Sequence, residues 1–277
     1  MSAVDASRAR SLPWGRWLVL LIAAVYFIGP LAAAFWFSIR NTHGVDFGAY
    51  TEIPSAPGLL DAVLLSLEIS AVAVLVTLIL MVPTMLLLHL RLPGLRPVVE
   101  VLCLLPLVVP PIVLVVGVGK VIAWGNTTDT SSARWQVTNQ LLNSHPPLIL
   151  PLLYVVLALP FTFRALDAGI RAVPLTTYVE AAQGLGASWW AVLWRVALPT
   201  LRSSVVTAAL LVFALAFGEF TVASILQYQP FTVWLLQFNN TDGRLTTALS
   251  LISLGFTWVL LTGFSVVTSS RQKGAAS

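Results

Sequence analysis

Six apolar stretches, each about 17 residues or longer, dominate this chain of 277 residues. They run over Trp17–Ile39, Leu59–Leu90, Val98–Trp124, Pro147–Phe163, Leu201–Leu226 and Leu245–Thr268. A helix needs about 20 apolar residues to cross a hydrocarbon layer roughly 30 Å thick. None of the stretches shows the apolar–polar alternation of a barrel strand. The pattern therefore predicts an all-α membrane protein with six transmembrane helices.

The composition agrees with a chain whose solvent is lipid. Hydrophobic residues make up 58% of it and charged residues only 9%, whereas a soluble domain has roughly 45–50% and about 25%. A disordered chain would need the opposite balance. The single cysteine, Cys103, excludes a disulfide-held scaffold.

The basic residues predict the orientation. With the N-terminus inside, 11 of the 15 Lys and Arg residues fall on inner segments. The other four are Arg40, Lys120, Arg134 and Arg244. This bias predicts that both termini are cytoplasmic. We expect a cytoplasmic segment over 1–16, a membrane domain over 17–268 and a cytoplasmic tail over 269–277. The first apolar stretch is too long for a signal-peptide core and is interpreted as an uncleaved helix.

The inner segment 164–200 is too long and too apolar for a plain linker. We expect Thr176 or Thr177 to cap a short helix, and Gly184 and Gly186 to end it. A second helix is expected to begin near Ser188, with Trp190, Leu193, Trp194 and Ala197 as its apolar residues. Such a helix–turn–helix could be a docking surface, or a structural hairpin on the lipid headgroups.

Seven residues of this segment resemble the EAA loop of bacterial ABC-importer permeases. They are Glu180, Ala181, Ala182, Gly186, Val196, Leu198 and Pro199. The usual pattern is EAA-x3-G-x9-I-x-LP, and this chain departs from it only by valine in place of isoleucine. The resemblance covers about residues 60–268. It implies a MetI-like type I importer fold in which the 164–200 segment couples the membrane domain to an ATPase.

The resemblance also implies partners: a second permease subunit (a homologous chain or a copy of this one), two cytoplasmic ATPase subunits that bind ATP-Mg, and an external substrate-binding protein. It places the chain in the bacterial inner membrane. The chain has no G-x-x-x-x-G-K-[ST] phosphate loop, so we expect a non-catalytic subunit with no cofactor of its own. A self-contained secondary transporter is the alternative from another class.

Three charged residues fall within the apolar stretches: Glu68, Lys120 and Glu219. A charge in hydrocarbon costs at least about 2.5–3.5 kcal/mol, so each is a functional candidate. One interpretation is a Glu68–Lys120 ion pair, with Glu219 hydrogen-bonded to a neighbour. The other is that all three line the substrate path. The run Gly218-Glu219-Phe220 resembles a Gly-Glu-Phe found in sulfate/molybdate, iron and polyamine permeases.

Two acidic side chains in the path would suit a cation, so a polyamine such as spermidine or putrescine is the expected substrate. An oxyanion, a phosphonate, thiamine or ferric ion remains the alternative. No catalytic residues and no metal-ligand cluster are expected, because the three histidines are scattered. Pro83, Pro106, Pro110 and Pro111 can kink or open their helices. The outer run 227–238 is expected to be a short interfacial helix or an aromatic belt.

Overall fold

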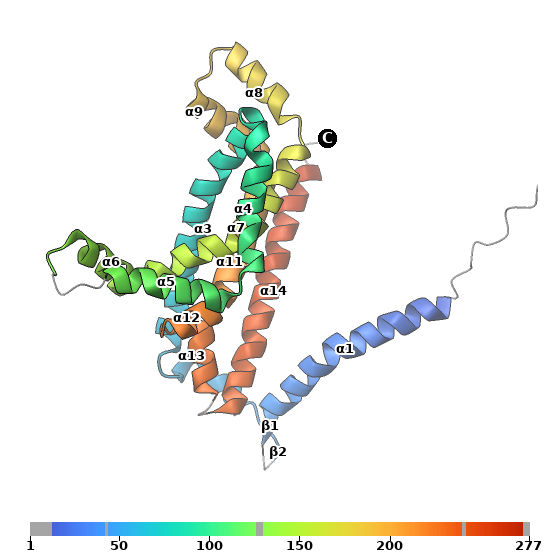
Figure 1. Ribbon diagram of the computed structural model, residues 1–277. Coiled ribbons are helices and arrows are strands. Elements are labelled where there is room, and N and C mark those ends of the chain that lie inside the picture. The colour runs from blue at the N-terminus through green and yellow to red at the C-terminus, as the bar shows by residue number, and fades with distance from the viewer. Residues whose placement is uncertain (1–12, 42–43, 126–129, 240–241, 274–277) are drawn as a thin grey trace, which may run out of the picture. The chain divides into compact units, whose positions relative to one another are not determined.

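The computed structural model describes residues 13–41, 44–125, 130–239 and 242–273 (Figure 1). Most of the predicted segment 1–16 and the end of the tail 269–277 therefore lie outside the described residues. The chain forms two compact units, described separately below: Met1–Ala56 with Leu235–Trp258, and Pro57–Trp234 with Val259–Ser277.

The first unit contains α1 (Pro13–Ile39) and a small hairpin. Strands β1 (Arg40–Asn41) and β2 (Gly44–Val45) pair antiparallel, with Arg40 opposite Val45. The short helix α2 (Gly48–Glu52) and a 3-10 turn, η1 (Ile53–Ser55), follow. Two helices continue from one unit into the other: α13 (Phe231–Phe238) and α14 (Gly243–Lys273).

The second unit is a helical bundle built on α3, α7 and α11. Its helices in chain order are α3 (Leu59–Leu90), η2 (Pro93–Leu95), α4 (Arg96–Val108), α5 (Pro111–Gly125), α6 (Ala133–Asn143), α7 (Ile149–Arg171), α8 (Leu175–Gly184), α9 (Trp189–Val192), the π-helix η3 (Leu193–Ala197), α10 (Leu198–Thr200), α11 (Arg202–Gly218) and α12 (Thr221–Ile225). Figure 1 shows α8 and α9 at one end of this bundle and α5 turning away from α4.

Four stretches of the described chain are long and apolar enough to span a membrane: Trp17–Ile39, Leu59–Leu90, Ile149–Arg171 and Arg202–Ile225. A fifth is the broken pair of α4 and α5, which meet at 101°. The sixth predicted stretch, 245–268, lies within α14. The predicted all-α architecture is confirmed, and the structure is consistent with six spans.

The structure opens the third predicted stretch and corrects one boundary of the fourth. The stretch Val98–Trp124 is divided into α4 and α5, because Pro110 and Pro111 have no N–H; an opening at these prolines was expected as one possibility. The fourth span continues past Phe163 to Arg171, since Leu166 and Ile170 remain buried in the bundle. Pro83, Pro106 and Pro160 lie inside helices without breaking them.

Two apolar clusters hold the second unit together. One joins α3 and α7 to α8 and α9, through residues such as Met85, Phe163 and Val179. The other lies further along the bundle, around Leu150 and Val212. Alanines at helix contacts, such as Ala73, Ala158 and Ala208, are fully buried. Small residues of this kind let membrane helices approach closely, where van der Waals packing replaces the hydrophobic effect.

Candidate functional site: the coupling knob and the break hollow

The segment that resembles the EAA loop folds into a compact projection, here called the knob (residues 175–192: α8, its turn and α9). Helix α8 ends in a Schellman turn. Ala187 N–H donates to the Ala182 carbonyl at 3.0 Å and Gly186 N–H to the Gln183 carbonyl at 2.9 Å. Gly186 has φ +83°, a left-handed conformation that favours glycine. The motif glycine is thus explained by how α8 ends.

The two helices of the knob begin differently. Helix α9 begins beside Ser188 as predicted, and the Ser188 hydroxyl caps it by accepting the Ala191 N–H at 3.3 Å. Helix α8 follows Pro174, so the prediction that Thr176 or Thr177 caps it was wrong. Proline at that position fixes φ and ends α7, which leaves both threonines inside the first turn of α8.

The knob is anchored by its inner face. Leu175, Val179 and Val192 are at most 3% exposed and pack on the ends of α3 and α7. Burying each such side chain from water contributes about 1.5–3 kcal/mol. Of the four apolar residues expected in the second helix, Leu193 and Ala197 are buried, whereas the rings of Trp190 and Trp194 are 68% and 65% exposed. The π-helical turn from Leu193 replaces regular helical spacing there.

The seven motif residues differ in how far they are exposed to solvent. Glu180, Ala181, Gly186 and Pro199 are exposed, whereas Ala182, Val196 and Leu198 are half-buried. Leu185, at the apex beside Gly186, is 90% exposed. Among the described residues Glu180 forms no ion pair with Arg171 or Arg195; Arg171 instead pairs with Asp167. The exposed residues therefore present a carboxylate, a small side chain and a leucine to a partner.

Two helix breaks meet at a hollow of about 350 Å³, here called the break hollow. One wall is the α4–α5 corner over 106–111, and the rest comes from Leu157, Phe161, Leu215 and Glu219. Because Pro110 and Pro111 have no N–H, the carbonyls of Pro106 and Leu107 lose their usual helical donors. Glu219 lies in the gap between α11 and α12. Discontinuous helices of this kind often form transport sites.

Glu219 caps the short helix α12. Its carboxylate accepts the Val222 N–H at 3.0 and 3.1 Å and the Ala223 N–H at 3.4 Å. The Glu219 carbonyl accepts the Thr232 hydroxyl at 2.7 Å. The buried Tyr154 hydroxyl faces the carboxylate without a well-aligned hydrogen bond. Backbone donors therefore compensate the negative charge of Glu219 at the edge of the hollow.

The other two intramembrane charges do not join Glu219 in the hollow. Glu68, on α3, has Oε2 3.3 Å from Nδ1 of His145. Lys120, on α5, is exposed. The alternative of a Glu68–Lys120 ion pair was therefore wrong. Helix α5, which carries Lys120, meets α4 at 101°, so Lys120 does not lie on a straight continuation of α4. Only Glu219 of the three lines the hollow.

The predicted short helix over 227–238 forms as α13, but two of its aromatic side chains are not free. Phe231 and Trp234 are 5% and 9% exposed. The Phe231 N–H donates to Ser66 at 2.7 Å, and Trp234 Nε1 donates to the Pro57 carbonyl at 3.1 Å. The start of α13 is thus part of the bundle core.

Sequence reasoning missed a charged cluster around Asp167 at the end of α7. Its carboxylate lies 3.0 Å from side-chain nitrogens of His89, Arg96 and Arg171. One signal was available: Asp167 is the only acidic residue in 164–179, four residues before Arg171. That spacing favours an ion pair on a helix.

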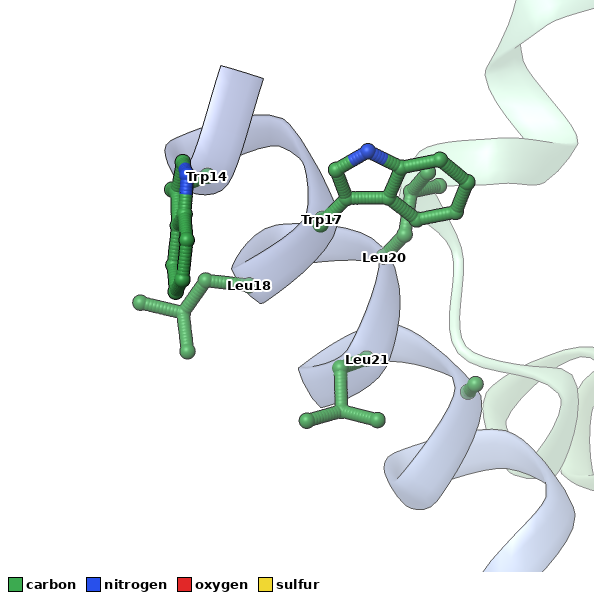
Figure 2. Close-up of a pocket in the computed structure, with 6 residues that line it drawn as sticks. Trp14, Trp17, Leu18, Leu20 and Leu21 are labelled. Carbon is green, nitrogen blue, oxygen red and sulfur yellow. The ribbon is translucent and has the colours of Figure 1, made fainter. Parts of the chain in front are cut away.

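Two further concavities are apolar. One, of about 560 Å³, lies between α3 and α11 and is lined by residues such as Leu75, Leu78 and Phe213. The other, of about 490 Å³, lies along α1; Figure 2 shows its residues Trp14, Trp17 and Leu21. Neither offers acid, base or nucleophile, and the described residues contain no cluster of three His, Cys, Asp or Glu side chains that could hold a metal.

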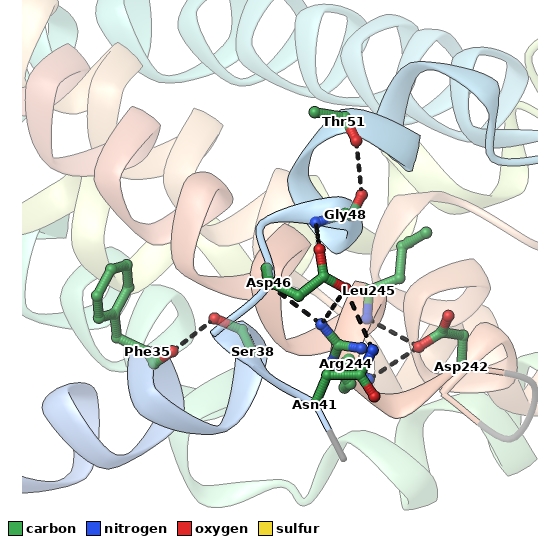
Figure 3. Close-up of polar contacts among 9 residues, drawn as sticks. All are labelled: Phe35, Ser38, Asn41, Asp46, Gly48, Thr51, Asp242, Arg244 and Leu245. Atoms are coloured by element: carbon green, nitrogen blue, oxygen red, sulfur yellow. Dashed lines mark hydrogen bonds and ion pairs between the residues drawn. The ribbon is translucent and has the colours of Figure 1, made fainter. Parts of the chain in front are cut away.

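The first unit has its own polar network, drawn in Figure 3. Asp46 accepts the Gly48 N–H at 2.7 Å and lies 3.3 Å from Nη2 of Arg244. These two groups lower the pKa of Asp46 below 3.8, the Gly48 N–H most. Asp242 caps α14 by accepting the N–H groups of Arg244 and Leu245, both at 3.0 Å. The network ties the turn after α1 to the start of α14.

Comparison with known proteins identifies the family. Residues 70–270 match the model of the binding-protein-dependent transport system inner membrane component. The molybdenum transport system permease protein ModB of Mycobacterium tuberculosis is 28% identical over 258 residues, 90% of this chain and 93% of that protein. The sulfate transport system permease protein CysW of Escherichia coli is 26% identical over 254 residues, 87% and 84% of the two chains.

A third relative is the molybdate/tungstate transport system permease protein WtpB of Thermococcus kodakarensis, 31% identical over 119 residues, 42% of this chain and 47% of that one. The family works with an ATPase and a substrate-binding protein in the inner membrane, and its members are multi-pass permease subunits. The chain belongs to this family and is an inner-membrane permease subunit of an ABC importer.

Proposed function

We propose that this chain forms half of the translocation path of an importer for a tetrahedral oxyanion such as molybdate or sulfate. The observation that carries the proposal is similarity over nearly the whole chain to permeases named for molybdenum and sulfate. A second permease subunit completes the path. Two ATPase subunits bind ATP-Mg and dock on the knobs, and an external protein delivers the ion.

The environments of the acidic residues support this choice. The expectation of a polyamine depended on Glu68 and Glu219 as free anionic groups. Glu219 is occupied by the N–H groups of Val222 and Ala223, and Glu68 lies beside His145. The Glu219 carboxylate is therefore committed to α12, which weakens the argument for a cationic substrate. The polyamine stays a prediction without support from the relatives, and the oxyanion alternative is preferred.

The break hollow suits passage rather than tight binding. Its lining contains no Lys or Arg, and most of its side chains are apolar. A fixed cation would hold an oxyanion strongly and slow its release, whereas an import path must let the ion leave. Selection then belongs to the external binding protein. Leu107, Leu157, Phe161 and Leu215 form the wall that the ion passes.

The knob suits the transfer of force. Its inner face is packed on α3 and α7, so a push on the exposed side of α8 moves the helix ends with it. The basic residues Arg91, Arg96, Arg171, Arg195 and Arg202 lie at the ends of the helices that surround the knob. Their enrichment supports a cytoplasmic position for the knob and for both termini. Closure of the ATPase pair would bring two such knobs together.

The test is uptake by the assembled importer in vesicles, with its own ATPase and binding protein. We expect ATP-dependent accumulation of radiolabelled molybdate or sulfate, competed by unlabelled oxyanion and absent without ATP. Radiolabelled spermidine serves as the cation control and is expected to stay outside. Accumulation of spermidine without either oxyanion would overturn the proposal.

A further inference from the structure

Three basic or titratable side chains from three helices meet at one carboxylate, that of Asp167, outside both the knob and the break hollow. Asp167 Oδ1 lies 3.0 Å from Nε2 of His89 on α3 and 3.0 Å from Nη2 of Arg96 on α4. Its Oδ2 lies 3.0 Å from Nε of Arg171, one turn further along α7. The Asp167 and His89 side chains are only 16% and 15% exposed, so water screens these contacts weakly.

The cluster stands where force from the knob would enter the bundle. Helix α7 ends at Arg171, and α8 begins at Leu175. The end of α3 makes a second contact with the knob, because the Arg91 guanidinium lies 4.8 Å from the centre of the Trp189 ring on α9. Helix α3 is thus connected to α7 through His89 and to the knob through Arg91.

Arg96 connects the same carboxylate to the break hollow. It is the first residue of α4, and its Nη2 donates to both oxygens of Asp167 at 3.0 Å. The 13 residues of α4 form a rod about 20 Å long. The other end of this rod is the corner over 106–111 that lines the hollow. A shift of Asp167 therefore moves a helix whose far end shapes the path.

We propose that Asp167 is a positioning residue that couples the knob to the break hollow through Arg96 and α4. It touches neither the ion nor the ATPase. Its carboxylate holds together two arginines, from α4 and α7, and lies beside the imidazole of His89 on α3, so that these helix ends move as one body when the knob is pushed. The inference rests on the proposed importer function and adds the element that transmits the movement.

The experiment compares Asp167→Asn with the wild type in the assembled importer, measuring uptake and ATP hydrolysis together. We expect uptake to fall roughly 2- to 30-fold, the range of coupling changes that single residues produce. Basal ATP hydrolysis should remain, so the ATP consumed per ion rises by a similar factor. Asp167→Glu keeps the carboxylate and should retain most of the uptake. A joint fall of uptake and hydrolysis in proportion, as from lost folded complex, would overturn the proposal.

Arg164→Gln is the matched control, because it removes an exposed charge from the same helix and should leave the ATP-to-ion ratio unchanged. The double variant Arg96→Gln/Asp167→Asn should be less impaired than the sum of the single variants, because the two residues share one contact. Full additivity would contradict the proposed link through Arg96.

A second measurement does not depend on the transported ion. Amide hydrogen exchange over residues 175–192 in the purified complex should become faster in Asp167→Asn and stay unchanged in Arg164→Gln. Unchanged exchange in Asp167→Asn would refute the role of Asp167 even if oxyanion uptake is confirmed. Conversely, faster exchange together with uptake of a different ion would retain this inference and reject the proposed substrate.

Discussion

Glu219 is a charged residue within an apolar span. The free energy that its charge costs there is offset by neighbouring backbone groups. Placing a charge in the hydrocarbon costs at least about 2.5–3.5 kcal/mol. The break between α11 and α12 exposes N–H groups, and two of them, from Val222 and Ala223, donate to the carboxylate. The helix break supplies N–H groups for the carboxylate, and the carboxylate satisfies N–H groups that the break leaves unpaired. We therefore interpret Glu219 as a residue that stabilises the structure around the hollow.

This structural role predicts different stability and uptake for two variants of Glu219. Glu219→Gln keeps an acceptor oxygen for α12 and should retain most uptake. Glu219→Ala leaves the N–H groups of α12 without their cap, which costs about 0.5–2 kcal/mol of stability, and should lower both the melting temperature and uptake. Melting curves and vesicle uptake check both outcomes. Loss of uptake in a fully stable Glu219→Gln protein would show instead that the charge acts on the transported ion.

Asp46 gives the first unit a pH-dependent contact. The Gly48 N–H and the Arg244 guanidinium lower the pKa of the folded carboxyl below its ordinary value of 3.8. Between the folded and unfolded pKa values the unfolded chain binds more protons, so stability rises with pH there. The contribution is complete at neutral pH, declines as the pH falls below 3.8, and is lost below the folded pKa.

Asp46→Asn should therefore lower the melting temperature at neutral pH and match the wild type in strong acid. The difference in melting temperature between the wild type and Asp46→Asn, measured at each pH, reports on this carboxyl alone, because the other acidic groups are the same in both proteins. In an Arg244→Gln background, Asp46→Asn should lower the melting temperature at neutral pH by less, because one of the two groups that stabilise the charged form of Asp46 is gone. A difference that does not change with pH would contradict this account.

At the scale of elements, the sequence predicted what local chemistry decides. Hydropathy and backbone preference predict the helical architecture, the helix start near Ser188 and the stop at Gly186, and the structure contains all three. Contacts between distant segments were not predictable in this way. The break at Pro110 redirects α5, and the Glu68–Lys120 pair, one of the two interpretations, is absent because Glu68 lies beside His145. The cluster at Asp167 needs α3, α4 and α7 side by side, which no local pattern encodes.

One close helix contact is directly testable. A Cβ at Gly169 on α7 would overlap the Ser204 side chain on α11, including its Cβ. Gly169→Ala should therefore lower stability by about 1–3 kcal/mol through overpacking, despite its better helix propensity. Gly117→Ala is the control, since nothing lies within 4 Å of a Cβ at Gly117. Melting curves should show that Ser204→Gly rescues Gly169→Ala and that Ser204→Ala does not.

At the scale of the whole molecule, the chain is one part of a larger assembly. In the most apolar 18-residue window of the α1 span no residue is buried, whereas 61% of the residues in the corresponding window of α7 are buried. Helix α7 is thus at the centre of its bundle, and α1 offers its surface to lipid or to another subunit. The exposed Leu185 and Glu180 offer a second surface, at the knob.

Charge reversal at the knob tests this view of the assembly. Glu180→Lys should leave insertion and melting temperature unchanged, because Glu180 is exposed and lies outside the core clusters. The variant should lose its ATPase partner during purification and lose transport. Glu52→Lys reverses an exposed charge on α2 and should keep the ATPase bound. A Glu180→Lys complex that retains the ATPase and full ion-stimulated hydrolysis would reject the docking assignment.

The adjacent prolines at 110 and 111 limit how the segment that contains α4 and α5 can change shape during transport. Two consecutive residues without amide hydrogens cannot be absorbed into a straight helix, whatever ion or nucleotide is bound. The bend between α4 and α5 is therefore a permanent elbow, and the transport cycle can change its angle but cannot remove it. Movement that reaches α4 therefore cannot straighten α4 and α5 into one continuous helix, and the two helices keep separate axes on either side of the bend.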